Sequence, residues 1–109
     1  MESQYILGII YYEEKFIPRD INQSIHYFKL AANQNHMESQ YKLGLIYYKE
    51  EFISRDINQS IHYFKLAANQ NHMESQYKLG LIYYKEEFIS RDINQSIHYF
   101  KLAANQNHM

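Results

Sequence analysis

The sequence predicts an all-α solenoid, a right-handed superhelix of three tandem helix–loop–helix repeats. Three observations lead to this prediction: a long internal period, two amphipathic helical patterns within each period, and a loop between the two. One helical hairpin of this size cannot bury its apolar stripes, whereas stacked copies cover one another. We therefore expect residues 1–109 to form a single repeat domain.

The internal period is 36 residues, with units at residues 1–36, 37–72 and 73–108, and Met109 starts a missing fourth unit. The second and third units are identical at every position. The first unit differs from them at five positions, which carry Ile6 for Lys42, Ile9 for Leu45, Glu13 for Lys49, Lys15 for Glu51, and Pro18 for Ser54. Ordinary drift does not preserve a whole unit, so we expect an engineered or recently amplified array.

The first helix of each unit is expected over residues 1–14 and their counterparts. Its inward face follows the helical period and comprises Ser3, Gln4, Leu7, Gly8, Ile10 and Tyr11. Glycine in a helix costs about 1 kcal/mol relative to alanine, and close approach of a second helix would compensate at Gly8. Pro18 then indicates a loop, because proline is unfavourable inside a helix.

The second helix is expected over residues 21–33, with Asp20 as its N-cap and Gln23 completing a capping box. Its apolar stripe comprises Ile21, Ile25, Phe28 and Ala32, flanked by Ser24, Tyr27 and Ala31, whereas Asn22, His26, Lys29 and Asn33 are expected in water. Asn35 belongs to the segment expected to end this helix, since Asn tolerates the left-handed conformation. Tyr27 and Leu30 are expected to contact the first helix of the following unit.

The unit resembles the Sel-one-like repeat (SLR), a branch of the tetratricopeptide-like superfamily. The resemblance rests on residues of the first helix, the loop and the second helix, namely Ser3, Tyr5, Leu7, Gly8, Tyr11, Tyr12, Ile17, Asp20, Ser24, Tyr27, Phe28, Ala31 and Ala32. Two family glycines are missing, one before the loop's apolar residue and one where Asn35 stands. The resemblance implies a non-catalytic α-solenoid whose first helices line a concave groove that binds other proteins.

Composition narrows the class of function. The 11 basic and 12 acidic residues give a net charge of −1, whereas a nucleic-acid binder needs a basic excess. There is no cysteine, hence no disulfide framework and no thiolate site. No apolar run approaches the roughly 20 residues of a membrane span, and no signal segment is present. We therefore expect a cytoplasmic protein without membrane contact.

A stripe on the outer side of the first helices is the candidate partner-binding site. We call it the first-helix stripe, and it comprises Tyr5, Ile9, Tyr12, Tyr41, Lys42, Leu45, Tyr48, Lys49, Tyr77, Lys78, Leu81, Tyr84 and Lys85. Exposed apolar patches and tyrosines are typical of protein interfaces, so the stripe could bind a peptide or a protein. Equally, adjacent first helices could pack on each other and bury much of it.

Other kinds of site are expected to be absent. The six histidines recur twice per unit, but no pair has metal-ligand spacing, so they are expected to be solvated residues or turn caps. Neither a catalytic constellation nor a phosphate-binding loop is present, and we expect no enzyme and no cofactor. The acidic neighbours of the stripe also disfavour nucleic acid.

The ends of the array predict a homo-oligomer. The last helix has no following unit to cover Tyr99 and Leu102, and Ile6 replaces a lysine at the other end. Covering one large side chain contributes about 1.5–3 kcal/mol, which favours association end to end or as a two-fold dimer. The predicted function is a non-enzymatic protein-interaction scaffold, and the alternative is a self-assembling structural repeat protein with no evolved ligand.

Overall fold

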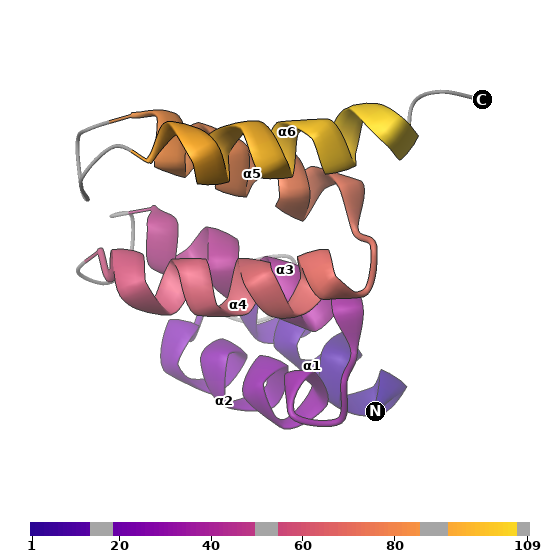
Figure 1. Ribbon diagram of the computed structural model, residues 1–109. Helices are drawn as coiled ribbons and strands as arrows, with labels where there is room; N and C mark the ends of the chain where they lie inside the picture. The colour runs from indigo at the N-terminus through magenta and orange to yellow at the C-terminus, as the bar shows by residue number, and fades with distance from the viewer. Residues whose placement is uncertain (14–18, 50–54, 86–91, 107–109) are drawn as a thin grey trace.

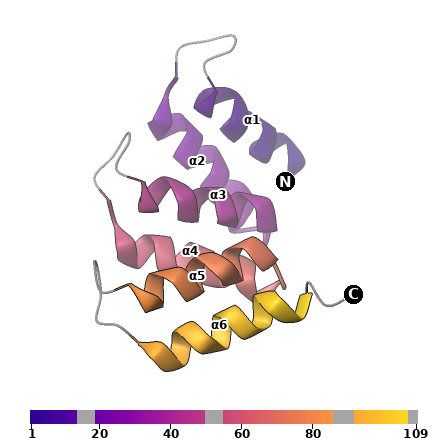
Figure 2. The ribbon, with the colours of Figure 1, turned by 90° about the horizontal axis from the view of Figure 1, so that it is seen from above.

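A computed structural model of the chain describes residues 1–13, 19–49, 55–85 and 92–106. The described residues form six helices and no strand. Their bounds are α1 (Glu2–Tyr12), α2 (Ile21–Ala32), α3 (Met37–Tyr48), α4 (Ile57–Asn69), α5 (Met73–Tyr84) and α6 (Ile93–Gln106). Each helix packs against the next one along the chain, so three hairpins stack in order (Figures 1 and 2). The predicted all-α solenoid is confirmed.

Both predicted helices occur in every unit, and their ends lie close to the predicted ones. α1 ends at Tyr12, where the sequence predicted Glu14, a residue outside the described ranges. α2 begins at Ile21 as predicted and ends one residue early, at Ala32. Pro18, the predicted loop residue, also lies outside the described ranges.

A glycine brings the two helices of each hairpin close together. A Cβ atom added to Gly44 would lie 2.5 Å from the ring of Phe64, so a larger residue cannot fit beside that ring unless it moves. Next to this contact, the Ser60 hydroxyl donates a hydrogen bond to the Gly44 carbonyl oxygen, 2.8 Å away. The same contacts recur at Gly8 and Gly80. Close approach of the second helix, predicted at Gly8, is confirmed.

The second helix begins with the predicted aspartate cap. The Asp20 carboxylate accepts a hydrogen bond from the Gln23 backbone N–H at 3.1 Å. The backbone N–H of Asp20 donates to the Tyr11 carbonyl oxygen instead of to the Gln23 side chain, so the reciprocal half of the capping box is replaced. Arg19 Nε donates to the Tyr12 carbonyl oxygen at 2.8 Å. Together these bonds join the end of α1 to the start of α2.

The second helix ends in a left-handed asparagine. Asn35 has φ of 68°, and its backbone N–H donates to the Ala32 carbonyl oxygen. The next N–H, from His36, donates to Ala31, which completes the paired bonds of a Schellman motif. Asn71 repeats this geometry with φ of 71°. Asparagine thus fills the position for which the family uses glycine.

Two apolar clusters hold consecutive units together. The first joins residues of unit 1, including Phe28 and Ala32, to Leu43, Ile46 and Tyr63 of unit 2. The second joins unit 2 to unit 3 through the equivalent residues. Most of the hydrophobic core therefore lies between units and not within one hairpin.

The predicted direction of packing at Tyr27 and Leu30 is wrong. Their counterparts Tyr63 and Leu66 pack into the cluster shared with the preceding unit, not with the following one. In the first unit Leu30 is accordingly 37% exposed. For the same reason Tyr99 is only 9% exposed at the other end of the array, although the sequence predicted it to be uncovered.

Candidate functional site

The apolar members of the first-helix stripe lie between units in the first two repeats. Tyr5, Ile9 and Tyr12 pack half-buried against the first cluster, which contains Leu43 and Ile46 of the next first helix. Tyr41, Leu45 and Tyr48 occupy the same places against the second cluster. The sequence left two interpretations open, binding of a partner and packing between adjacent first helices. For these six residues the structure shows the packing.

In the third unit the equivalent tyrosines are exposed. Tyr77 is 49% exposed and Tyr84 is 55% exposed, while Leu81 is half-buried. The second and third units have the same sequence. The exposure of these tyrosines therefore differs because unit 3 packs on unit 2, whereas no described unit packs on this side of unit 3. A binding role for the apolar part of the stripe stays a prediction.

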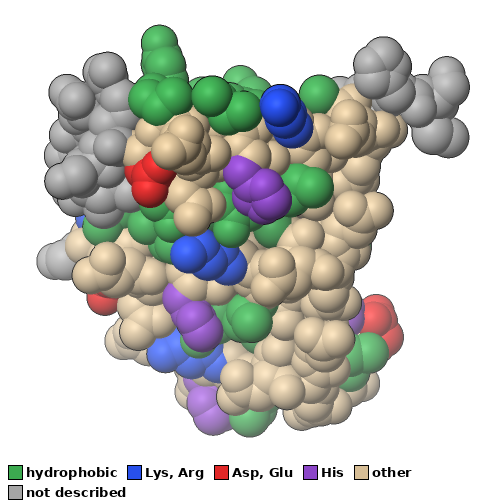
Figure 3. Space-filling view, in the orientation of Figure 1, with side chains coloured by type: hydrophobic (Ala, Val, Ile, Leu, Met, Phe, Trp, Pro, Cys, Tyr) green, Lys and Arg blue, Asp and Glu red, His purple; other side chains and the backbone are tan. Residues whose placement is uncertain are grey.

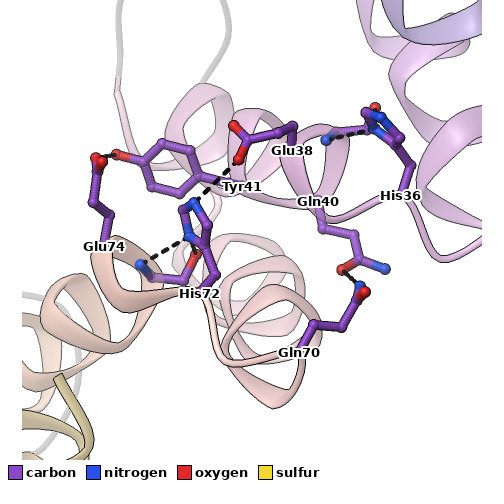
Figure 4. Close-up of polar contacts among 9 residues, drawn as sticks. His36, Glu38, Gln40, Tyr41, Gln70, His72 and Glu74 are labelled. Atoms are coloured by element: carbon purple, nitrogen blue, oxygen red, sulfur yellow. Dashed lines mark hydrogen bonds and ion pairs between the residues drawn. The ribbon is translucent and has the colours of Figure 1, made fainter. Parts of the chain in front are cut away.

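Tyr41 shows how one stripe residue connects two units. Its ring lies 4.7 Å from the His72 ring and 5.9 Å from the Phe64 ring. Its hydroxyl donates a hydrogen bond to the Glu74 carboxylate of the next unit at 3.0 Å (Figure 4). Burial, aided by this carboxylate, raises the pKa of Tyr41 to about 12. The phenol therefore stays a neutral donor at physiological pH.

The lysines of the stripe lie away from the inter-unit clusters. Lys49 and Lys85 are exposed, and Lys42 and Lys78 are half-buried. None of the four forms an ion pair with another described residue. Their ammonium groups are therefore available to a partner.

The glutamates that border the stripe are engaged by neighbouring side chains. The Glu2 carboxylate lies 2.9 Å from His36 Nε2, and Glu38 lies 3.4 Å from His72 Nε2. Glu74 accepts the hydrogen bond from Tyr41. The glutamates keep their negative charge in these bonds, whereas the four stripe lysines form no ion pair with the described residues.

The histidines at the turns cap the following helices, as the sequence predicted. His36 Nδ1 accepts a hydrogen bond from the Ser39 backbone N–H at 3.2 Å at the start of α3. This places the ring proton on Nε2, which faces Glu2. His72 repeats the arrangement at α5 (Figure 4). His108, the third histidine of this kind, lies outside the described residues.

A ladder of glutamines was not predicted from the sequence. Gln40 is 1% exposed; its Nε2 donates to the Ala32 carbonyl oxygen of the preceding unit at 3.2 Å, and its Oε1 accepts from Gln70 at 2.8 Å (Figure 4). Gln76 repeats both bonds, with Ala68 and Gln106. The signal that could have found it is the glutamine on the apolar face of every first helix, where a polar residue needs partners.

Lys29, which the sequence placed in water, is half-buried instead. Its ammonium group lies 5.8 Å from the centre of the Tyr47 ring in the next unit. A hydrogen bond with Tyr47 raises the pKa of Lys29. Lys65 makes the same contact with Tyr83. In Figure 3, side chains coloured as Lys or Arg alternate with His side chains up one face of the stack.

The described residues contain no group of three or more metal-binding side chains. A shallow depression of about 420 Å³ is lined by Asp56, Asn58, Gln59 and His62, but Asp56 is already the cap of α4. No described helix has both the length and the apolar character to span a bilayer.

Comparisons with known proteins agree with the geometry. The profile of the Sel1 repeat matches residues 2–36, 38–72 and 74–108. No curated protein sequence matches the chain. Among solved structures, c5321, a protective antigen of uropathogenic Escherichia coli displaying an SLR fold, superposes with a TM-score of 0.89 at 27% identity. A Sel1 repeat protein from Oxalobacter formigenes gives a TM-score of 0.85 at 26% identity.

These two structures are longer than the chain. The matches cover 98% and 96% of this chain, but 23% of the Escherichia coli protein and 43% of the Oxalobacter protein. The similarity therefore describes the repeat array and not the whole of either protein.

Proposed function

Because the chain belongs to the Sel1 repeat family, whose repeats generally mediate protein–protein interaction, we propose that it is a non-enzymatic scaffold that binds an acidic protein segment along α1, α3 and α5. The observation that carries this proposal is the unequal engagement of charge on these helices. The glutamate row is engaged by His36, His72 and Tyr41, whereas the stripe lysines form no ion pair with the described residues.

The packing of α3 explains why this side of the helix is open. Gly44 faces α4, Leu43 faces the preceding unit, and Tyr41 faces the following unit. The remaining side carries Lys42 and Lys49. The same side recurs in α5, so an extended partner would meet equivalent groups at each repeat.

Apolar groups beside the lysines support binding of a mixed apolar and acidic segment. Leu45 and Leu81 are half-buried next to the lysines, and Ile6, which takes the place of a lysine in unit 1, is 52% exposed. The lysines would then orient the acidic partner and speed its association, while the apolar contacts would provide affinity.

The test is selection of a random dodecapeptide library on the immobilised chain, followed by fluorescence anisotropy of the enriched peptides. We expect the enriched peptides to carry acidic and apolar residues. The Lys42→Gln/Lys78→Gln variant should bind them about tenfold more weakly, since each ion pair at a surface contributes up to about 1 kcal/mol.

A matched control is Asn22→Glu/Asn58→Glu, which makes the same change in net charge at exposed positions of α2 and α4. Glutamate in the first turn of a helix is favourable, so this variant keeps its fold. The control should bind like the unmodified chain. Equal weakening of both variants, or enrichment of peptides without acidic residues, would overturn the proposal.

A further inference from the structure

The first helices change their chemistry from unit to unit on one side only. Residues spaced by three and then four positions lie on the same side of a helix, and each first helix has one such set where the units differ. We call these sets the triplets: Ile6, Ile9 and Glu13 in unit 1, Lys42, Leu45 and Lys49 in unit 2, and Lys78, Leu81 and Lys85 in unit 3.

The unit 1 triplet contains every difference between unit 1 and the other units within the described residues. Of the five differing positions, Lys15 and Pro18 lie outside the described ranges, and the other three form the triplet. The rest of α1 has the same residues as α3 and α5, including Gly8, which contacts α2. The described differences are therefore confined to one side of one helix.

The replacements at the two ends of the unit 1 triplet do not stabilise α1. Ile6 is 52% exposed, so its side chain gains little from burial, and isoleucine favours a helix less than lysine does. Glu13 is exposed at the C-terminal end of α1, where the helix dipole favours a positive charge. Contact with a partner explains these two residues better than the stability of the helix does.

The backbone at the triplets is the same in the different units. Glu13 follows the end of α1 with φ of −90° and ψ of 135°, and Lys49 follows the end of α3 with φ of −86° and ψ of 137°. The backbone N–H groups of both residues donate to the carbonyl oxygen four positions earlier. Each triplet can therefore stand in any of the three units without a change of fold.

The triplets differ in the sign of their charge. Glu13 is the one charged member in unit 1, whereas units 2 and 3 each have two lysines seven residues apart, which is about 10 Å along a helix axis. None of these charged groups forms an ion pair with another described residue. Because the units stack in order (Figure 2), a partner that crosses them meets an apolar and acidic site on α1 and then basic sites on α3 and α5.

We propose that the first helices bind a bipartite protein segment in one orientation, with its acidic residues on α3 and α5 and with an apolar and a basic residue on α1. This inference rests on the proposed function and adds the composition and the order of the partner. The basic residue pairs with Glu13, and the apolar residue covers Ile6. A segment that is acidic throughout would place a carboxylate beside Glu13, and this juxtaposition of like charges is unfavourable.

The first test is the composition of the dodecapeptides selected on the unmodified chain. An extended dodecapeptide spans about 40 Å, and the longest dimension of the chain is 42 Å, so one peptide is long enough to contact all three first helices. We expect acidic residues at one end of the selected peptides and apolar and basic residues at the other. Selected peptides that are acidic from end to end would overturn the inference without any variant.

The second test gives unit 1 the triplet of the other units, in the variant Ile6→Lys/Ile9→Leu/Glu13→Lys. The bipartite peptides should bind this variant at least tenfold more weakly in fluorescence anisotropy, because their basic residue then faces lysines. Peptides newly selected on the variant should be acidic throughout. Circular dichroism verifies that the variant is as helical as the unmodified chain.

The third test exchanges the triplets of units 1 and 3, by adding Lys78→Ile/Leu81→Ile/Lys85→Glu to the first variant. The exchange leaves the net charge unchanged, so it is the matched control for the second test. A nitroxide at the acidic end of a bipartite peptide should broaden the methyl signals of Ile82 in the unmodified chain. In the exchange variant it should broaden those of Ile10 instead, because the peptide binds in the opposite orientation.

The outcomes distinguish this inference from the proposed function. Selected peptides without acidic residues would overturn both. If the peptides are acidic and are weakened by Lys42→Gln/Lys78→Gln, the proposed function stands. In that case, equal binding to the unit 1 variant, or the same nitroxide contacts after the exchange, would overturn the bipartite orientation alone.

Discussion

The second and third units have the same sequence but different surroundings. Phe64 in the second unit is fully buried, whereas Phe100 in the third is half-buried. Tyr41 is half-buried and bonded to Glu74, whereas Tyr77 is 49% exposed. Since the residues are identical, the difference measures what a following unit contributes to the one before it.

Contacts within a hairpin do not change between these units. The glycine-to-phenylalanine contact, the serine hydrogen bond and the aspartate cap recur at Gly80, Ser96 and Asp92 with nearly the same distances as in unit 2. The comparison therefore separates two contributions: the hairpin is specified locally, and the burial of its outer faces is specified by neighbours.

The largest effect is expected from removing the buried phenylalanine ring. Phe64→Ala should lower the free energy of unfolding by about 4 kcal/mol, because a fully buried aromatic ring leaves a cavity between two units. Phe100→Ala should cost about half as much, since the half-buried ring already contacts water. Urea unfolding followed by circular dichroism measures both values, and equal losses would show that a following unit adds no burial energy at this position.

A smaller effect is expected at the glycines beneath these rings. In Gly44→Ala the new Cβ would lie 2.5 Å from the Phe64 ring, which is enclosed and cannot move, so we expect a loss of about 2 kcal/mol. In Gly80→Ala the half-buried Phe100 ring can shift.

The gain in helix propensity, about 1 kcal/mol, then offsets most of the cost at Gly80. The melting temperatures of the two variants, measured in the same buffer, provide the comparison. If Gly80→Ala were as destabilising as Gly44→Ala, the freedom of the Phe100 ring would be refuted.

The features predicted from the sequence are those specified within one hairpin. The helical period, the Asp20 cap, the close approach at Gly8 and the end of the second helix in the segment that contains Asn35 all depend on residues nearby in the chain, and the structure confirms each.

The features that were not predicted depend on which neighbour a face meets. Tyr27 and Leu30 lie at the edge of an apolar stripe, and the helical period alone does not tell whether that edge meets the preceding or the following unit. The same limit applies to Lys29, whose ammonium group contacts the ring of Tyr47 in the next unit. The first-helix stripe shows the same limit. Its tyrosines and aliphatic residues in the first two units pack between units, whereas its lysines lie outside the two apolar clusters.

The smallest expected effect is on the free energy of unfolding at alkaline pH, and it distinguishes Tyr41 from Tyr77. In the folded chain Tyr41 keeps its proton up to a pKa of about 12, whereas an unfolded tyrosine loses it near the ordinary value of 10.0. Between these values the unfolded state binds fewer protons, so the free energy of unfolding falls as the pH rises. Because Tyr41 is partly exposed, solvent screening reduces this contribution to about 1 kcal/mol.

Tyr41→Phe removes that titration, so its stability should fall less steeply between pH 10 and 12 than that of the unmodified chain. Burial also raises the pKa values of Tyr5, Tyr63 and Tyr99, which therefore contribute to the same alkaline loss in every variant and cancel in the comparison. Tyr77→Phe makes the same chemical change at an exposed position and should leave the slope closer to that of the unmodified chain. Urea titrations at a series of pH values measure these slopes, and identical slopes for both variants would mean that burial and the bond to Glu74 do not hold the Tyr41 proton.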